Sequence, residues 1–305
     1  MTKHLVEQRY IKWSIYAITV FAVISFVLGL LLQSQVILFD GLYSIISVFL
    51  SFFALVAFKF MNKSDSHRFP FGKDVIEPMV IIVKYFAIIV LISGSIIAAV
   101  IALFQGGRPV SIGAGLAYST FSSIFCYIVY KFLSTKGREI KSNLLRVEAN
   151  EWYLDTLVSF GVLIGFMIGF VLQFIPMLEP YIVYVDPVLM IVISLYFLKW
   201  PIIEIRQSMY EILDMRPLDG KPEFVEEKVD QIRELNGIEE SYVRVSKVGK
   251  TLWVDVNFLV QQQGVVDTID EQDRIRNEIY QKITELEVEK KWLTVAFTKE
   301  RDWAV

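Results

Sequence analysis

The chain has 305 residues, of which 54% are hydrophobic, and its mean hydropathy is +0.50. This composition excludes an ordinary soluble globular protein and indicates a membrane protein. A net charge of -3 without a dense cluster of Lys and Arg argues against a nucleic-acid partner, and the single Cys126 excludes a disulfide within the chain.

Six apolar runs approach or exceed the roughly 20 residues that a helix needs to span a bilayer. They are residues 14–32, 36–58, 78–104, 112–130, 143–174 and 186–205. The charged segment 1–13 lacks the apolar region and the cleavage site of a signal peptide, so the first run is expected to stay as a helix. We therefore predict a cytoplasmic N-terminal segment at 1–13 and a six-helix transmembrane transport domain at 14–216.

The segments between the runs predict the orientation of the chain. Positive charges gather after the second and fourth runs, at Lys59, Lys63, Arg68 and Lys73 and at Lys131, Lys136, Arg138 and Lys141. By the positive-inside rule both segments face the cytoplasm, so both termini are expected there and the chain is expected in the cell membrane. Lys84 is the exception inside the third run. We interpret it as a side chain that snorkels or pairs near the cytoplasmic side, with a role at an ion site as the alternative.

From Asp219 onward the composition becomes that of a small soluble domain. Two helices are indicated by the apolar stripes Val225, Val229 and Ile232, and Ile275, Ile279, Ile283 and Leu286. Alternating residues predict strands around Val243 and Val245, Leu252 to Phe258, and Leu293 to Phe297, with Gly249-Lys250 turning the first into the second. The order αββαβ predicts a cytoplasmic ferredoxin-like domain at 217–305.

Acidic residues inside two of the apolar runs mark the candidate site. Glu151 and Asp155 are four residues apart and share one helix face, as do Asp40 and Ser44. An acid at the centre of a membrane helix costs roughly 2.5 to 3.5 kcal/mol on insertion scales, so such residues usually line an ion or proton path. We interpret the two pairs as one cation site. Two unrelated polar positions are the alternative, because Asp40 lies near the outer end of its run and Glu151 near the inner end of its own.

Several stretches together resemble the cation diffusion facilitator family of divalent-metal transporters, over nearly the whole chain. They are Leu38-Phe39-Asp40-Gly41-Leu42-Tyr43-Ser44, His67-Arg68-Phe69-Pro70-Phe71-Gly72-Lys73, Asp186-Pro187 and Ile212-Leu213-Asp214. The resemblance implies a homodimeric secondary transporter, not an enzyme, that moves a cation across the lipid bilayer by alternating access. It also implies that cation export is coupled to proton import.

The family resemblance implies a four-coordinate transport site with Asp-xxx-Asp on the second helix and His-xxx-Asp on the fifth, where Asn or Asp can replace the His. Asp40 and Asp155 match this pattern, whereas Ser44 replaces the second Asp and Glu151 replaces the His. We expect these four residues to hold the transported cation, and we expect no prosthetic group. Ligand sets made only of oxygen suit hard cations, which favours Mn²⁺, with Fe²⁺ and Mg²⁺ next, over Zn²⁺.

Other positions match the family less completely. His67 matches one ligand of a metal site in the cytoplasmic loop, but Phe71 replaces its later His, so a complete site is not expected there. The residues after 216 include no His, which favours a dimerisation role over metal sensing. Lys73 and Asp214 match an interlocking salt bridge near the dimer interface of the family; an ordinary interfacial pair, or no pair, is the alternative.

The departures at Ser44 and Glu151 leave a second function open. The chain is alternatively a family-like membrane protein that has lost ordinary metal transport and serves a regulatory or other ion-coupled role. An intramembrane enzyme is not supported, because the sequence shows no paired His, no embedded Ser-Lys constellation and no metalloprotease motif.

Overall fold

The computed structural model describes residues 3–61, 63, 67–140, 143–261, 266–286, 288 and 290–304. Residues 1 and 2 of the predicted N-terminal segment, Lys141 of the predicted cytoplasmic loop, and Val305 lie outside the described residues. The chain forms two compact units. We name them the helical unit, Met1–Ala54 with Lys84–Ile202, and the mixed unit, Leu55–Val83 with Ile203–Val305.

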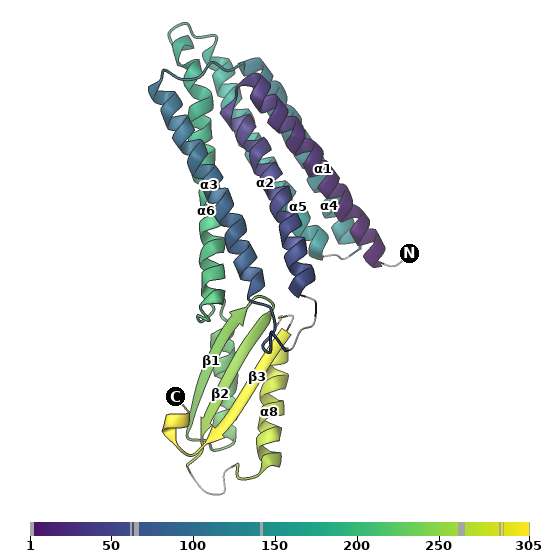
Figure 1. Ribbon diagram of the computed structural model, residues 1–305, viewed down its shortest axis with the longest axis vertical. Helices are drawn as coiled ribbons and strands as arrows, with labels where there is room; N and C mark the ends of the chain where they lie inside the picture. The colour runs from purple at the N-terminus through teal and green to yellow at the C-terminus, as the bar shows by residue number, and fades with distance from the viewer. Residues whose placement is uncertain are drawn as a thin grey trace. The chain divides into compact units, whose positions relative to one another are not determined.

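The six apolar runs fold as six long helices (Figure 1). They are α1 Lys3–Leu32, α2 Gln35–Met61, α3 Ile76–Phe104, α4 Ile112–Glu139, α5 Asn143–Leu172 and α6 Val185–Ile212. Within the described residues, five of these contain stretches long and apolar enough to cross a membrane, and α2 contributes the shorter apolar stretch Gln35–Leu50. The chain is therefore an integral multi-pass membrane protein of the predicted helical class.

Helix α4 is longer than its apolar run, because it ends at Glu139 rather than at Tyr130. Lys136 and Arg138 occupy its last turn, where positive charge interacts favourably with the helix dipole. Lys136 also pairs with Glu139 at 2.7 Å. Lys131, Lys136 and Arg138, expected in a loop, thus lie on a helix that continues past its apolar part.

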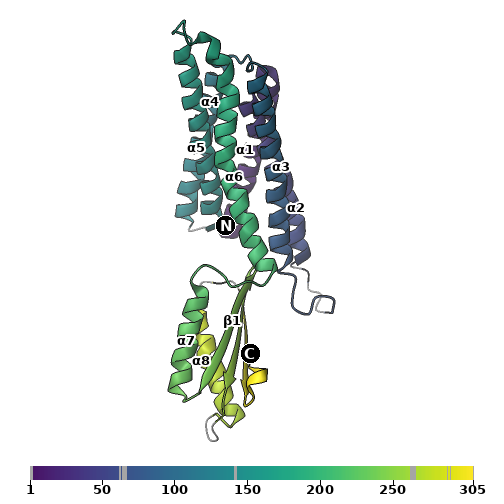
Figure 2. The same cartoon turned by 90° about the vertical axis from the view of Figure 1, so that its left-hand side faces the viewer.

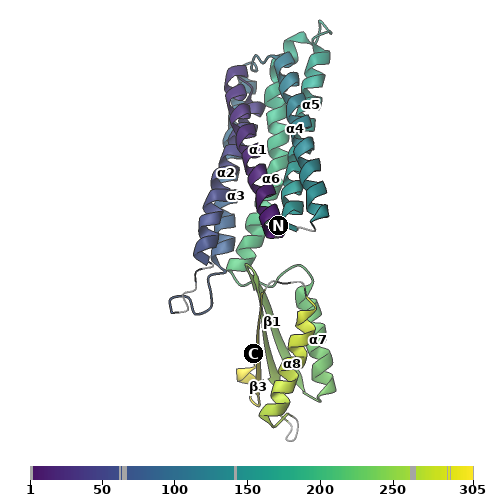
Figure 3. The same ribbon diagram turned by 90° about the vertical axis from the view of Figure 1, so that its right-hand side faces the viewer.

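Helices α4 and α5 lie side by side in the helical unit (Figures 2 and 3). The fully buried ring of Phe166 on α5 fills the space left by Gly115 on α4, since a Cβ at Gly115 would lie 2.5 Å from that ring. On another face of α5, a Cβ at Gly165 would lie 2.1 Å from the Leu189 side chain of α6. Small residues therefore set the close spacing of these helices, as is common in membrane bundles.

The mixed unit contains the predicted αββαβ order, with α7 Lys221–Leu235, β1 Glu240–Val248, β2 Thr251–Leu259, α8 Ile269–Thr284 and β3 Lys290–Thr298. The strands lie in the order β1-β2-β3, with β1 antiparallel and β3 parallel to β2. Helices α7 and α8 cover one face of this sheet (Figure 2). The predicted apolar stripes of both helices are buried in the resulting core, except that Leu286 lies beyond the end of α8 and is only partly buried against it.

The hairpin between β1 and β2 has the predicted turn. Val248 pairs with Thr251, which leaves Gly249 and Lys250 as a two-residue connection. Gly249 has a φ of 54°, a left-handed conformation that glycine adopts without steric cost. Along β2 the alternating residues predicted to face the core are all buried, namely Leu252, Val254, Val256 and Phe258.

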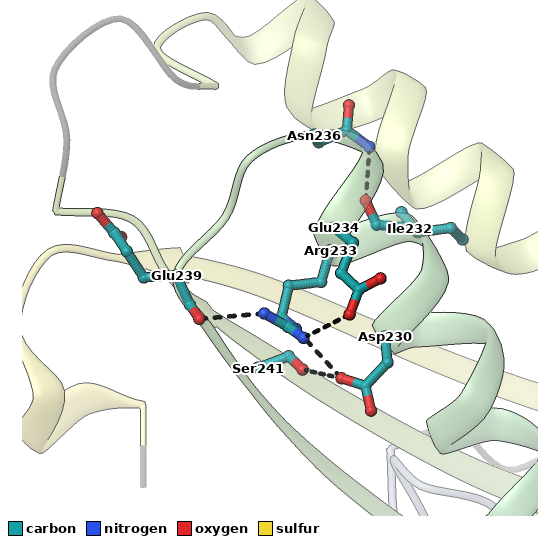
Figure 4. Close-up of polar contacts among 7 residues, drawn as sticks. All are labelled: Asp230, Ile232, Arg233, Glu234, Asn236, Glu239 and Ser241. Carbon is teal, nitrogen blue, oxygen red and sulfur yellow. Dashed lines mark hydrogen bonds and ion pairs between the residues drawn. The ribbon is translucent and has the colours of Figure 1, made fainter.

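The ends of the two helices in the mixed unit are fixed by side chains. Near the end of α7, Arg233 pairs with Asp230 at 3.2 Å and donates to the Glu239 carbonyl at 3.2 Å, which ties the helix to the start of β1 (Figure 4). At the start of α8, Thr268 and Glu271 form a reciprocal capping box. Hydrogen bonds from the Thr268 backbone and side chain lower the pKa of the Glu271 carboxyl.

Candidate functional site

Asp40 lies on α2 where α1 crosses it at very short range. A Cβ at Gly41 would lie 2.4 Å from the backbone nitrogen of Phe26, so only a glycine permits this crossing. The close approach also places Ser25 of α1 next to α2, since its carbonyl carbon would lie 2.9 Å from the same Cβ. The Asp-Gly dipeptide therefore combines an acidic side chain with the helix contact that positions it.

The Asp40 carboxylate is held by a buried phenol from α4. Tyr118, which is 6% exposed, places its hydroxyl 2.6 Å from Asp40 Oδ2 and 2.6 Å from Ser25 Oγ. A phenol has one proton and an ionised carboxylate only accepts, so Tyr118 donates to Asp40 and Ser25 donates to Tyr118. Three helices, α1, α2 and α4, thus meet at Asp40.

The two acids of α5 lie one helical turn apart. The Asp155 side chain is partly buried, and Glu151 is exposed. Asp155 interacts electrostatically with both Asp40 and Glu151. The Tyr43 phenol on α2 lies within electrostatic range of all three carboxylates. The structure therefore brings the predicted acids of α2 and α5 to the same region of the helical unit.

Asp40, Glu151 and Asp155 lie in the same region but do not form a complete metal coordination shell. Among the residues that the structure describes, no three His, Cys, Asp or Glu side chains lie close enough to hold a metal ion together. Ser44 is 5% exposed and lies one turn along α2 from Asp40. The joint ligation of a cation by Asp40, Ser44, Glu151 and Asp155 stays a prediction.

Two further charged residues belong to this region. Glu148 lies one turn before Glu151, so Glu148, Glu151 and Asp155 share the α5 face, and Asp155 interacts electrostatically with both. Glu148 accepts a hydrogen bond of 2.6 Å from Ser14 on α1. The spacing of three and four residues was the signal that identifies Glu148 as the third member of an acidic row.

Lys84 on α3 is the second charged residue, and its positive charge acts on Glu151. It is half-buried, and its ammonium lies 5.8 Å from the centre of the Tyr85 ring. Lys84 thus offsets part of the negative charge that the acids of α5 bring to this region.

Asp186, at the first turn of α6, fixes the start of α2. It is 1% exposed and accepts hydrogen bonds from Ser34 Oγ and, at 2.8 Å, from the backbone nitrogen of Gln35. Ser34 in turn accepts from the Ile37 backbone nitrogen at 3.4 Å, as an N-cap residue does. The carboxylate is favourable at this helix N-terminus, so Asp186 anchors the helix that carries Asp40 to α6.

The other predicted positions lie in the mixed unit. Lys73 is 7% exposed, donates to the carbonyls of Phe60 at 3.2 Å and Lys63 at 2.8 Å, and lies over the Phe60 ring. Asp214 accepts from Ser246 at 3.4 Å. The predicted pairing of Lys73 with Asp214 and any metal role for the exposed His67 stay predictions.

A family model for the cation efflux transmembrane domain matches residues 11–213. The manganese efflux system protein MneS of Bacillus subtilis (strain 168) is 25% identical over 277 residues, which cover 89% of each chain. The uncharacterized transporter YdbO of the same organism is 24% identical over 277 residues, which cover 87% of this chain and 89% of that one. Since the family model covers well over half of the sequence, this chain belongs to the cation efflux family, and its function is metal cation efflux.

Proposed function

We propose that this protein exports a divalent cation in exchange for protons, through a site formed by Asp40, Ser44, Glu151 and Asp155. The observation that carries the proposal is the electrostatic coupling of Asp40 on α2 with Asp155 on α5, the two residues that match the family pattern. Two carboxylates that interact electrostatically repel each other when both are ionised, and a cation between them removes the repulsion. Cation binding therefore draws α2 and α5 together.

The ligand chemistry supports a hard cation. The candidate site offers three carboxylates and one hydroxyl, and the chain has only two His, at positions 4 and 67, far along the sequence from both acid pairs. Oxygen ligands suit Mn²⁺, Fe²⁺ and Mg²⁺ better than Zn²⁺. The relative named as a manganese efflux protein supports placing Mn²⁺ first.

Protons are the natural counter-substrate of a carboxylate site. A proton and a metal ion compete for the same oxygen lone pairs, so protons entering from one side can displace the cation toward the other. Residues 1–13, which precede the transport domain 14–216, and residues 217–305, which follow it, then both face the cytoplasm. The positive charges of Lys63, Arg68 and Lys73 favour this orientation.

The homodimer is proposed from the face of the sheet opposite α7 and α8 in the mixed unit. Trp253 and Trp292 are paired in register across β2 and β3 with ring centroids 5.0 Å apart, and Trp292 is 48% exposed. Large aromatic side chains such as the exposed Trp292 are typical anchors of protein interfaces. A second copy of the chain is the partner that the family resemblance implies.

Removal of one carboxylate tests the transport site. In everted membrane vesicles, Asp155→Asn is expected to abolish proton-driven Mn²⁺ uptake, because the amide neither carries the charge nor exchanges a proton. Glu179→Gln, at an exposed acid before α6, is the matched control and is expected to transport normally. Unchanged uptake by the Asp155→Asn variant would contradict the proposed site. Absence of uptake by the folded wild-type protein, for every cation tested, would instead favour the alternative of a family-like membrane protein that does not transport metal.

A further inference from the structure

A pocket lies in the mixed unit where α6 ends and the chain continues toward α7. Its volume is about 330 Å³, within the range of roughly 300 to 1,000 Å³ that is typical of small-molecule sites. The last turns of α6, the segment 215–219 and Lys247 of β1 line it. We name it the linker pocket. Its described lining residues all belong to the mixed unit, whereas the acids of the proposed transport site belong to the helical unit.

The linker pocket contains one positive charge that no described acid neutralises. Lys247 pairs with Glu211 at 2.9 Å, and Asp219 pairs with Lys221. Arg206 makes no hydrogen bond or ion pair with any residue that the structure describes. A guanidinium carries five N–H donors and stays charged at every physiological pH, so it suits the oxygens of a phosphate or a carboxylate. The pocket therefore favours an anion.

Much of the remaining lining is apolar. Ile203, Tyr210, Met215 and Leu218 contribute to it, and the Tyr210 ring centre lies 5.7 Å from the Arg206 guanidinium. Leu218 is 77% exposed, so a ligand can still cover most of its side chain. A small inorganic anion gains nothing from this apolar surface, whereas a molecule that joins an anionic group to hydrocarbon gains from both parts of the lining. The occupant that fits is an amphiphilic anion.

The position of Arg206 along α6 indicates the source of such a ligand. Asp186 lies in the first turn of α6, and Arg206 follows it by twenty residues on the same helix. At 1.5 Å per residue the two are roughly 30 Å apart along the axis, which is about the thickness of the hydrocarbon core of a bilayer. Arg206 thus reaches the headgroup level opposite Asp186. In the orientation proposed above this is the cytoplasmic leaflet, whose surface is negatively charged by anionic lipids.

We propose that the linker pocket binds an anionic phospholipid, with the phosphate on Arg206 and an acyl chain against Tyr210, Met215 and Leu218. The Gln207 amide, which also lines the pocket, can donate to further headgroup oxygens. A lipid held in this way contacts both α6 and the segment 215–219, so it stabilises the connection between them. The inference uses the proposed orientation but not the proposed transport site.

The charge of the pocket is tested with the full-length protein in detergent, by native mass spectrometry during titration with dioleoylphosphatidylglycerol. Arg206→Gln is expected to raise the Kd for this lipid about tenfold, because hydrogen bonds to a charged group are lost. The zwitterionic dioleoylphosphatidylcholine is expected to bind more weakly than phosphatidylglycerol to the wild type and equally to the variant. The matched control is Arg274→Gln, which removes the same charge from an exposed position on α8 outside the pocket and is expected to bind as the wild type does.

The apolar lining is tested at constant charge. Leu218→Asn is expected to weaken phosphatidylglycerol binding several-fold, because part of the surface that contacts the acyl chain becomes polar. Leu235→Asn at the end of α7 is the matched control, since Leu235 is 79% exposed and does not line the pocket. Both side chains are largely exposed, so neither substitution removes packing from the core of the mixed unit.

The alternative occupants give different results. Unchanged phosphatidylglycerol affinity in Arg206→Gln or in Leu218→Asn overturns the lipid site. Equilibrium dialysis that shows Arg206-dependent binding of inorganic phosphate, without retention of phosphatidylglycerol, identifies a site for a soluble anion and overturns it as well. A change in the mass of the protein in Arg206→Gln, measured by light scattering at unchanged lipid affinity, identifies the pocket as an interface between copies of the chain instead.

Discussion

At the residue scale, the departure of Glu151 from the family pattern is offset by Lys84. The substitution of an imidazole by a carboxylate adds a negative charge, and the ammonium of Lys84 on α3 acts on that same carboxylate. Lys84, interpreted from the sequence as snorkelling or pairing near the cytoplasmic side, thus acts on a residue of the proposed ion site.

Neutralising Lys84 tests this balance. Lys84→Gln is expected to raise Mn²⁺ affinity at least a few-fold, because the ammonium that acts on the Glu151 carboxylate also repels a cation bound there. Glu151→Gln is expected to weaken Mn²⁺ binding by about tenfold, or about 1.4 kcal/mol. Binding isotherms of both single variants and the double variant provide the measurement. Weaker binding in Lys84→Gln would contradict a compensating role.

The sequence predicts the acids of the site better than their partners. Asp40 and Asp155 are identified from spacing and from the cost of burying charge in a membrane. Tyr118 is not, because an aromatic residue in an apolar run is ordinary and its contact with Asp40 exists only after α4 packs against α2. Glu148 was identifiable from helical spacing, whereas Asp186 acquires its role only through the start of α2.

At the element scale, the crossing of α1 and α2 determines where Asp40 is held. Gly41 lies against the backbone of α1, which leaves no room for a methyl group. The apolar runs predict the helices themselves, because hydrophobic residues mark the part of each helix that lies inside the bilayer. They miss the end of α4, since a helix that emerges from a membrane continues with polar residues such as Lys136 and Arg138.

A methyl group at this crossing tests its importance. Gly41→Ala is expected to destabilise the helical unit by about 1 to 3 kcal/mol and to lower transport, because the new Cβ would lie 2.4 Å from Phe26 and must push α1 away from α2. Gly161→Ala on α5 is the control, since no described atom outside its own helix turn lies within 4 Å of its Cβ position. Thermal unfolding in detergent and Mn²⁺ flux are the measurements. Equal stability of the two variants is incompatible with a tight crossing.

At the scale of the whole molecule, the mixed unit carries the surface that we propose for dimerisation. Its sheet has one face covered by α7 and α8 and another that carries Trp253 and Trp292. The αββαβ order and the buried faces of β2 and α8 follow directly from the periodicity of the sequence. The proposed pairing with a second chain does not follow from periodicity, because no sequence period identifies the partner of an exposed aromatic residue.

A charge on the aromatic face tests the proposed dimer. Trp292→Glu is expected to weaken dimerisation by about 2 kcal/mol or more, the scale of an interface hot spot. Tyr280→Glu is the matched control, because Tyr280 on α8 is also 48% exposed but belongs to a helix on the opposite face of the sheet. Light scattering of the detergent-solubilised protein gives the mass of each species. A dimeric Trp292→Glu variant rules out this face as the anchor.

The central claim is cation export by an oxygen-rich carboxylate site in exchange for protons. The most direct measurement is flux by the reconstituted wild-type protein across Mn²⁺, Fe²⁺, Mg²⁺, Co²⁺, Zn²⁺ and Cd²⁺, with the internal pH recorded in the same vesicles. We predict the fastest flux for Mn²⁺, slower flux for Zn²⁺ and Cd²⁺, and proton movement opposite to the cation. Zn²⁺ flux above Mn²⁺ flux, or cation movement with no change in internal pH, would contradict the account.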